Sequence, residues 1–289
     1  MSAVLKAKNV FAINAFEDIE LSDKLFRKFA ELMYQLAGVD LPDTPKNHAL
    51  VRNRIIKILR RRGLDSYEAY WDMLETKKPE YQQEFIEALT TNMTSFYRES
   101  AHFDFLTRIL PEMHAKNNEI RIWCAAASTG QEPYTIAITC KEALNDTLAR
   151  RTRILATDID TQVLKRGSVG AYEDRDMQGL PPLLRSKYFD KVSQKGRDFY
   201  RAKDDIHGMI KFAVFNLIQQ RYEFKNKFHV IFCRNVLIYF DEQTTKKVIE
   251  NLVTSLEVGG YLILGHSESG NVKHQNLKPL SRAVYQKIG

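Results

Sequence analysis

Apolar side chains recur at helical spacing through the first part of the chain. Between residues 21 and 36, where Ser22 or Asp23 fits an N-cap, they occupy Leu21, Leu25, Phe26, Phe29, Leu32, Met33 and Leu36. The spacing continues through residues 50–64, where Gly63 predicts a stop, and through residues 66–75 and 80–91. The pattern predicts an all-α domain over residues 1–89.

From Arg121 the pattern changes to short β-rich runs that alternate with helical segments such as residues 242–256. The runs are RIWCA, RILATD, IKFAVFNL, FHVIFCRNVLIYF and GYLILGH, and AVYQKI at 283–288 predicts an edge strand. Strands that alternate with helices predict a parallel sheet flanked by helices, which is an α/β fold. Residues 171–210 lack a long apolar helix, and we interpret them as a small inserted hairpin unit.

Length and composition fit two domains, because 289 residues with 44% hydrophobic and 27% charged residues are ordinary for globular proteins. The longest apolar runs fall far short of the ~20 residues that a membrane-spanning helix needs, and the amino end lacks a signal-peptide core. We therefore expect a cytoplasmic protein without direct membrane insertion. Cys124, Cys140 and Cys233 show no C-x-x-C spacing and are expected to be buried thiols.

The chain carries an excess of positive charge, with a net charge of +7 and a pI of about 9.1. Such an excess favours an acidic partner, which could be nucleic acid, an acidic protein or anionic lipid. Charge alone does not choose among these three classes.

A strand-like run at 120–124 is followed by small residues from Ala125 to Gly130 and then by a helical pattern from Glu132. Small residues in a turn let a ligand approach the backbone, and the helix that follows offers free N–H groups and the positive end of its dipole. The turn lacks the G-x-G-x-x-G spacing of dinucleotide-binding folds, which disfavours a nicotinamide or flavin dinucleotide.

Polar residues interrupt three apolar runs at the predicted carboxyl ends of strands, where an α/β sheet binds its ligand. Asp158 ends the second run and is suited to accept both ribose hydroxyls, although it could instead cap a helix that begins at Thr161. The other interruptions are Asn216–Leu217 and Arg234–Asn235. A ribose acceptor, an amide for an adenine edge and a polar pair beside the turn fit an adenosine ligand without a phosphate chain, such as S-adenosylmethionine.

Three further features have structural alternatives. Glu132 is either a ligand contact or the acid of a T-x-x-E capping box over residues 129–132, and the two roles do not exclude each other. His266 follows a strand without clustered ligands, so we interpret it as structural and assign no metal. The polar segment 90–103 could close over a ligand; alternatively, Thr94 caps a helix start and Arg98 pairs with nearby acids.

Several motifs together resemble those of the chemotaxis-receptor methyltransferases, the CheR family. In this sequence they are TNMTSFYRE at 91–99, AASTGQEPY at 126–134, ATDID at 156–160, FCRNVLIYFD at 232–241 and GHSE at 265–268. The resemblance covers nearly the whole chain. It implies an all-α N-terminal domain over residues 1–89, followed over residues 90–289 by a Rossmann-like S-adenosylmethionine-dependent methyltransferase domain with a small antiparallel β insertion.

The resemblance also implies an activity, which is methyl transfer from S-adenosylmethionine to the γ-carboxylate of glutamates on the cytoplasmic helices of chemoreceptors. The product is S-adenosylhomocysteine. Matching motif positions imply cofactor contacts by Asn92, Thr94, Arg98, Glu132, Asp158, Asn216, Leu217, Arg234 and Asn235. By the same match, Arg98 and Tyr239 lie nearest the reacting methyl. Because the acceptor is already anionic and the sulfonium is already activated, alignment of the two partners can replace a general base.

Residues 51–62 predict a strongly basic helix, in which Arg54, Lys57, Arg60 and Arg61 lie opposite the apolar side and no acid neutralises them. We interpret this face as a docking surface for acidic receptor helices, with an ordinary solvated face as the alternative. In the CheR family the β insertion can capture a receptor tail peptide, but residues 189–202 here contain fewer glycines than that role suggests. Recruitment by a receptor tail or a response regulator therefore stays open.

Two rival functions remain at the level of sequence. A nucleic-acid methyltransferase would suit the pI, but the Asp/Asn-Pro-Pro-Tyr element common in enzymes that methylate exocyclic amines is missing after the fourth strand. The Pro-Pro pair of this chain, Pro181–Pro182, lies in the insertion. A non-catalytic S-adenosylmethionine sensor or scaffold would keep the pocket without needing Arg98 or Tyr239 to face a substrate.

Overall fold

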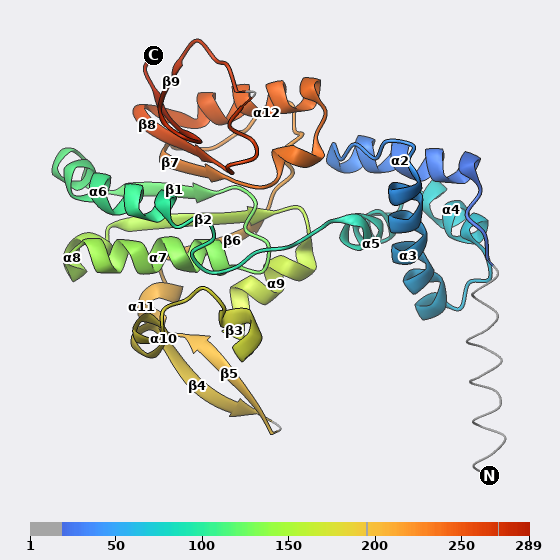
Figure 1. The fold of residues 1–289 in the computed structure, drawn as a ribbon, viewed down its shortest axis with the longest axis horizontal. Coiled ribbons are helices and arrows are strands. Elements are labelled where there is room, and N and C mark those ends of the chain that lie inside the picture. The colour runs from blue at the N-terminus through green and yellow to red at the C-terminus, as the bar shows by residue number, and fades with distance from the viewer. Residues whose placement is uncertain (1–18, 195, 271) are drawn as a thin grey trace. The chain divides into compact units, whose positions relative to one another are not determined.

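The computed structural model describes residues 19–194, 196–270 and 272–289 (Figure 1). The chain divides into two compact units, Met1–Thr91 and Asn92–Gly289. This division lies close to the domain boundary predicted at residues 89–90. Residues 1–18 of the predicted all-α domain lie outside the described ranges.

The described part of the first unit is helical, as predicted. Its helices are α2 (Asp23–Ala37), α3 (Pro45–Arg62), α4 (Tyr67–Glu75) and α5 (Pro79–Leu89). The side chain of Ser22 accepts a hydrogen bond from the N–H of Leu25 and caps α2, and Gly63 ends α3 in a left-handed conformation. Both sequence signals are confirmed. The apolar faces enclose a core that includes Phe26, Phe29, Met33, Val51, Ile55, Leu59, Tyr70 and Phe85.

A seven-stranded sheet organises the second unit in the order β6-β2-β1-β7-β8-β10-β9. Strands β6, β2, β1, β7 and β8 are parallel, which confirms the predicted α/β fold. The strands are β1 (Ile120–Cys124), β2 (Thr152–Asp158), β6 (Ile210–Val214), β7 (Phe228–Cys233), β8 (Leu256–Leu264), β9 (Leu277–Ser281) and β10 (Val284–Lys287). The helices of this unit outside the insertion are α6 (Ala101–Lys116), α7 (Gln131–Ala143), α8 (Asp146–Ala149), α9 (Thr161–Val169) and α12 (Glu242–Ser255).

The carboxyl-terminal edge of the sheet differs from the prediction. β10 was expected to form the edge, but it lies between β8 and β9 and pairs antiparallel with both. The edge strand is β9, which contains Pro279. Proline has no N–H to donate, so an edge strand tolerates it where an interior strand does not.

Side chains of the central strands alternate between two cores. Ile122 and Cys124 of β1 join the core that contains the apolar side chains of α6 and α7, whereas Trp123 joins the core on the α12 side. Because both faces of the sheet are covered, residues on both sides of β1 and β7 are apolar. This continuous apolar pattern is why the two strands could be predicted from the sequence. All three cysteines are buried and free, as predicted.

The insertion between α9 and β6 is a separate antiparallel sheet in the order β3-β5-β4, which confirms the predicted hairpin unit. Its strands are β3 (Ala171–Tyr172), β4 (Phe189–Gln194) and β5 (Arg197–Ala202), and its short helices are η1 (Asp174–Met177), α10 (Pro182–Tyr188) and α11 (Asp204–His207). Figure 1 shows the β4–β5 hairpin extending away from the main sheet.

A hydrogen bond joins the insertion to the turn that follows β1. The hydroxyl of Tyr172 donates it to the carbonyl oxygen of Thr129 at 2.9 Å. Gly130 lies beside this bond with a φ of 97°. A Cβ at Gly130 would lie 2.7 Å from the hydroxyl oxygen of Tyr172 and 2.8 Å from the Cα of Gly167. Internal packing and backbone conformation therefore require a glycine at this position, whether or not a ligand approaches the turn.

Within the described ranges, no helix is both long and apolar enough to span a membrane.

Candidate functional site

The predicted site residues of the second unit gather at the carboxyl ends of adjacent strands. β1 pairs with β2 on one side and β7 on the other, so that Cys124 is in register with both Ala156 and Phe232. β8 continues the sheet, with Leu264 in register with Cys233. Asp158, the turn after β1, Arg234 and the loop after β8 consequently share one edge, as expected for an α/β sheet.

Asp158 is nearly buried, with 9% of its surface exposed, at the end of β2. Its Oδ2 accepts the N–H of Ser128 at 2.8 Å, and its Oδ1 accepts the N–H of Asp160 at 3.1 Å. Burial raises the pKa of Asp158, and the backbone N–H groups offset this rise only in part. The backbone N–H of Ile159 is a third donor to this carboxylate. The two oxygens offer about four acceptor sites in all, so the carboxylate keeps capacity for a further hydrogen bond.

The alternative in which Asp158 caps the next helix is wrong. The cap of α9 is Asp160, whose Oδ1 accepts the N–H groups of Gln162 and Val163 at 2.9 and 3.1 Å. The Oδ2 of Asp160 accepts a hydrogen bond from the Nδ2 of Asn92 at 2.7 Å. Ser128 Oγ in turn donates to the carbonyl oxygen of Asn92 at 3.0 Å. Asn92 is thereby joined to both the turn and the end of β2.

Glu132 does not form the proposed capping box. The N-cap of α7 is Gly130, which offers no side-chain bond, and the hydroxyl of Thr129 donates to the Oε1 of Gln131 instead. The carboxylate of Glu132 accepts a hydrogen bond from Arg234 Nη1 at 2.5 Å and another from Cys124 Sγ at 3.2 Å. Glu132 therefore points toward the strand ends, and its contact with a ligand stays a prediction.

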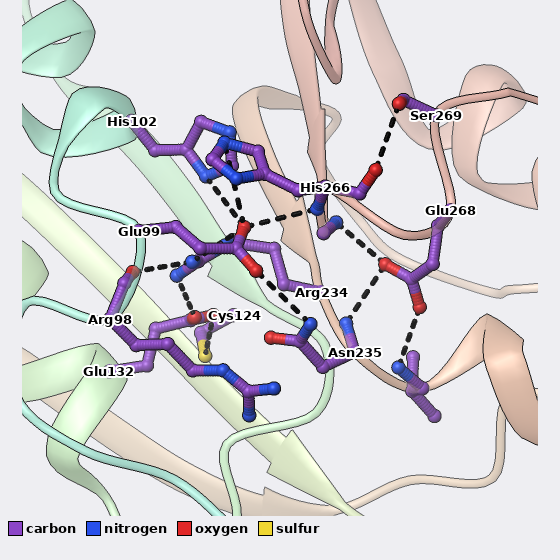
Figure 2. A network of polar contacts seen from close by, with 12 residues as sticks. Arg98, Glu99, His102, Cys124, Glu132, Arg234, Asn235, His266, Glu268 and Ser269 are labelled. Atoms are coloured by element: carbon purple, nitrogen blue, oxygen red, sulfur yellow. Dashed lines mark hydrogen bonds and ion pairs between the residues drawn. The ribbon is translucent and has the colours of Figure 1, made fainter.

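Arg234 is enclosed between two carboxylates, and its side chain has no exposed surface (Figure 2). Its Nη1 lies 2.5 Å from Glu132, while its Nη2 lies 3.1 Å from Glu99 and donates to the carbonyl oxygen of Arg98 at 2.5 Å. Burial alone would lower the pKa of Arg234, but the two carboxylates outweigh burial and raise it. The guanidinium is thus charged, with protein partners at Nη1 and Nη2, while its buried Nε has no hydrogen-bond partner among the described residues.

Arg98 lies between two residues in the left-handed region, Tyr97 with a φ of 51° and Glu99 with a φ of 57°. Its Nη1 donates to the carbonyl oxygen of Met93 at 2.9 Å, and the side chain is partly exposed. The helix here begins only at Ala101, so the alternative in which Thr94 caps a helix start is wrong. Strained backbone of this kind persists where the surroundings fix it, and it is common at functional sites.

Glu99 is a site residue that the sequence interpretation missed. Its carboxylate contacts Arg234 Nη2 at 3.1 Å, Asn235 Nδ2 at 3.3 Å and the N–H of His266 at 3.1 Å. Burial opposes its ionisation, but Arg234 and these donors lower the pKa of Glu99 overall. Its place beside Arg98 in the TNMTSFYRE motif was the signal available in the sequence.

Glu268 is a second missed residue. Its Oε1 accepts the N–H groups of Val236 and Leu237 at 2.8 Å each, and its Oε2 accepts those of Asn235 at 2.9 Å and Gly265 at 2.6 Å. Figure 2 shows Glu268 and Glu99 on the two sides of Asn235. Asn235 itself is left-handed, with a φ of 57°. The GHSE motif pointed to this loop, but the sequence did not reveal what the glutamate binds.

His266 has neighbours of metal-ligating type, so the expectation that it lacks clustered ligands is wrong. Glu99, His102 and His266 each place one ligand atom within 4.8 Å of the others. Burial, helped by Arg234, lowers the pKa of His102 to about 4, so its ring is neutral near pH 7. A divalent cation would nevertheless face the guanidinium of Arg234, which pairs with Glu99 at 3.1 Å. We assign no metal here.

The remaining predicted residues of this unit lie in the segments after β6 and β7 and before α6. Asn216 follows β6, and its Oδ1 accepts the N–H of Ile218 at 3.1 Å. Leu217 is buried in the core on the α12 side. Tyr239 ends the short helix η2 (Leu237–Tyr239) and is partly exposed. Thr94 lies partly buried in the segment before α6.

The basic helix α3 differs from its prediction, because an acid does neutralise part of it. Glu84 of α5 accepts from Arg61 Nη2 at 2.5 Å and from Arg62 Nε at 2.7 Å. Arg54 is partly buried, and its Nη1 donates to the carbonyl oxygens of Ala88 and Thr90 at 3.2 Å each. Of the four predicted docking residues, Lys57, Arg60 and Arg61 are exposed, and Arg61 is paired with Glu84.

Comparisons with known proteins agree with this arrangement. The family model "CheR methyltransferase, SAM binding domain" matches residues 92–285, and "CheR methyltransferase, all-alpha domain" matches residues 24–90. The chemotaxis protein methyltransferase of Escherichia coli (strain K12) is 37% identical over 270 residues, covering 93% of this chain and 92% of the relative. That of Salmonella typhimurium is 38% identical over 252 residues (87% and 85%), and that of Borreliella burgdorferi is 34% identical over 290 residues (97% and 98%).

The fold, the polar edge of the sheet and these matches define an S-adenosylmethionine-dependent methyltransferase. Its all-α domain and its relatives then specify the family: the chain belongs to the CheR methyltransferases, as its motifs predicted. Its cofactor is S-adenosylmethionine, and its activity is S-adenosylmethionine-dependent methylation in chemotaxis. The nucleic-acid and non-catalytic alternatives are disfavoured.

Proposed function

We propose that this protein methylates the γ-carboxylate of glutamates on the cytoplasmic helices of chemoreceptors and releases S-adenosylhomocysteine. The observation that carries the proposal is the attachment of residues 92–99 to the strand ends. Asn92 donates to Asp160, and the carbonyl oxygen of Arg98 accepts from Arg234. The residues proposed to meet the acceptor and those proposed to hold the cofactor are thereby joined within one unit.

The donor set at the strand ends fits the adenosine part of the cofactor. Asp158 keeps acceptor capacity after its backbone bonds from Ser128, Ile159 and Asp160, and a ribose hydroxyl requires an acceptor of this kind. The side chains of Asn216 and Asn235 supply amides, and Leu217 adds apolar surface. We place the ribose at Asp158 and the adenine toward Asn216 and Leu217.

Arg234 and Glu132 hold the site in a different way from the one implied by family resemblance. The guanidinium of Arg234 has no exposed surface, and its contacts are to Glu132, Glu99 and the backbone of Arg98. A cofactor contact by this residue would therefore fall to its backbone. We propose that the ion pair between Arg234 and Glu132 fixes the turn after β1 relative to Arg98. Asn92 and Thr94, which belong to the same segment as Arg98, would contact the cofactor.

The chemistry requires little from the protein beyond orientation. When bound, S-adenosylmethionine supplies a methyl group that is already activated on a sulfonium. A receptor glutamate is already an ionised nucleophile at neutral pH, so no residue has to remove a proton. Arg98 would orient the acceptor carboxylate by its charge, and Tyr239 would hold it by a hydrogen bond. Such alignment is worth up to ~7–11 kcal/mol of a reaction barrier.

The all-α unit would bring the receptor. Lys57 and Arg60 are exposed on α3, and an acidic methylation helix offers complementary charge. Arg54 and Arg61 contribute less directly, because each already contacts groups of α5 or the residue after it. Recruitment by a receptor tail or a response regulator is not part of the proposal.

Transfer of tritiated methyl to receptor-containing membranes, followed by alkali, tests this function. Carboxyl methyl esters release methanol in base, so we expect most of the label to become volatile. Receptors with their methylatable glutamates changed to alanine are the matched control and should stay unlabelled. Alkali-stable label, or label on added RNA or DNA, would reject glutamate methylation, and absence of any transfer would favour a sensor.

A further inference from the structure

The loop that follows β7 is organised around a single buried carboxylate. Three successive backbone N–H groups, those of Asn235, Val236 and Leu237, point to the two oxygens of Glu268 at 2.8 to 2.9 Å. A fourth N–H, that of Gly265, approaches the same side chain at 2.6 Å. Successive N–H groups that converge in this way form a concave anion site. Here the anion is a side chain of the protein itself.

The loop needs such an anchor for its backbone N–H groups. Asn235 has a φ of 57°, a left-handed conformation that asparagine adopts more readily than most side-chain-bearing residues. The three N–H groups would also lose their acceptor if the carboxylate were absent, since a buried polar group without a partner is costly. Glu268 is 7% exposed, so water could replace it only after local rearrangement.

The loop after β8 packs closely against the loop after β7. A Cβ on Gly265 would lie 2.6 Å from Asn235 Nδ2 and 2.6 Å from Glu268 Oε2. The two loops are therefore in direct contact, and the carboxylate fills the space between them. No Lys, Arg or His among the described residues forms an ion pair with Glu268. Burial raises the pKa of Glu268, and the four N–H groups offset this rise in part.

The anchored segment leads directly to the residues proposed for methyl transfer. Leu237 begins η2, and the N–H of Tyr239 donates to the carbonyl oxygen of Val236 at 3.1 Å, so Tyr239 follows the backbone that Glu268 holds. On the other side, Asn235 Nδ2 donates to Glu99, the neighbour of Arg98. The carboxylate thus acts on both sides of the proposed acceptor position.

We propose that Glu268 is a positioning residue for methyl transfer, whose carboxylate holds residues 235–237 against the end of β8 and thereby places Asn235 and Tyr239. The proposal rests on the proposed function for the identity of the acceptor. It predicts that loss of the carboxylate affects turnover more than cofactor affinity, because among the proposed adenosine contacts Glu268 holds Asn235, whereas Asp158, Asn216 and Leu217 lie on other strands.

The test compares the full-length protein with Glu268→Gln and with Glu223→Gln, an exposed glutamate of the same unit that serves as control. In Glu268→Gln the new amide places N–H groups against backbone N–H groups. We expect hydrogen exchange of the amides of residues 235–237 to accelerate at least tenfold while β1 is unchanged. The kcat for receptor should fall at least tenfold, and S-adenosylhomocysteine affinity should fall by a smaller factor, because Asn235 is one of several proposed cofactor contacts. The control should match the wild type.

Unchanged exchange at residues 235–237, equal acceleration throughout the unit, or normal kcat would overturn the proposal. If Glu268→Gln does not fold, Glu268→Asp keeps the charge with a shorter reach and should show the same local effect to a smaller degree. The exchange measurement also separates this proposal from the proposed function. Accelerated local exchange in a protein whose wild type does not methylate receptors would reject the function and leave the anchoring role supported.

Discussion

Arg234 Nη1 and Glu132 Oε2 form an ion pair of 2.5 Å between the end of β7 and the first turn of α7. The arginine also pairs with Glu99, so one buried guanidinium serves two carboxylates from distant parts of the chain. Such pairs add little net stability over apolar packing, but removal of one partner leaves charges buried without compensation. Arg234, Glu132 and Glu99 therefore stabilise the site only as a set, because loss of one charge leaves another uncompensated.

Arg234→Ala should lower the free energy of unfolding by about 3–5 kcal/mol, because it leaves Glu132 and Glu99 without their cation. Arg234→Lys should recover only part of the loss, since one ammonium does not reproduce the planar guanidinium that reaches both acids. Urea unfolding followed by circular dichroism measures both variants. Arg153→Ala removes an arginine that is 59% exposed and should cost less than 1 kcal/mol. A loss of similar size in both alanine variants would contradict the structural role of Arg234.

Asp158→Ala should weaken S-adenosylhomocysteine binding by roughly tenfold to a hundredfold, the equivalent of one charge-assisted hydrogen bond of about 1.5–3 kcal/mol. Titration calorimetry is the measurement. Because Asp158 also accepts the N–H groups of Ser128 and Asp160, Asp158→Asn serves as the shape-matched variant, and we expect an intermediate loss. Exposed Asp198 of the insertion supplies the control, Asp198→Ala. Full affinity in a folded Asp158→Ala protein would remove the ribose assignment.

Arg98→Ala and Tyr239→Phe should lower kcat by at least tenfold while S-adenosylhomocysteine affinity changes less, since each is proposed to act on the acceptor carboxylate. Steady-state methylation at saturating receptor, combined with calorimetry, separates the two effects. Arg108→Ala on the exposed side of α6 is the control for loss of a positive charge. Normal turnover in both site variants would restrict Arg98 and Tyr239 to structural roles.

Reversal of the exposed charges on α3, Lys57→Glu with Arg60→Glu, should raise the KM for receptor severalfold and leave S-adenosylhomocysteine binding intact. The wild-type KM should also rise with salt, and that of the variant should rise less, because exposed charges act over about 8–10 Å at physiological ionic strength. Lys24→Glu with Lys46→Glu makes the same change of net charge elsewhere in this unit and should have a smaller effect.

Competition identifies the partner of the same surface. A peptide that spans a methylation helix should inhibit receptor methylation well, whereas excess tRNA or duplex DNA should inhibit it weakly. Strong inhibition by nucleic acid together with no effect of the peptide would show that Lys57 and Arg60 do not dock receptor helices.

His102 should make the stability of the second unit depend on pH. Its folded pKa is about 4, below the ordinary value of 6.5, so between these values the unfolded state binds the additional proton. Stability from this group is therefore complete above about pH 6.5 and falls, by up to roughly 3 kcal/mol, as the pH decreases toward 4. Urea unfolding at pH 7 and pH 4.5 should show a smaller difference in His102→Gln than in the wild type. Identical differences would mean that His102 is not held neutral.

The sequence predicted the elements well where their patterns are local. Ser22 and Gly63 mark ends of α2 and α3, and the apolar runs of β1 and β7 mark strands covered on both faces. The order of β9 and β10 was missed because strand order depends on pairing between segments. Pro279 was the available signal, since proline belongs at an edge.

The site was predictable only at the level of residue type and strand end. Asp158 and Arg234 were placed correctly because parallel strands end together. Their partners were not, since Arg234 and Glu132 are 102 positions apart and no periodicity relates them. Local alternatives such as the capping box at Glu132 failed for the same reason, because a long-range ion pair occupies the carboxylate.

The bond between Tyr172 and Thr129 has a consequence for exchanging parts between relatives. The small sheet is fastened to the turn after β1 by a buried hydrogen bond, whose net loss would cost about 1–3 kcal/mol. Gly130 and Gly167 belong to the same contact. A side chain on Gly130 would overlap both Tyr172 and Gly167. A chimera that takes the insertion from another family member would therefore have to take the equivalents of Tyr172, Gly130 and Gly167 from that same member.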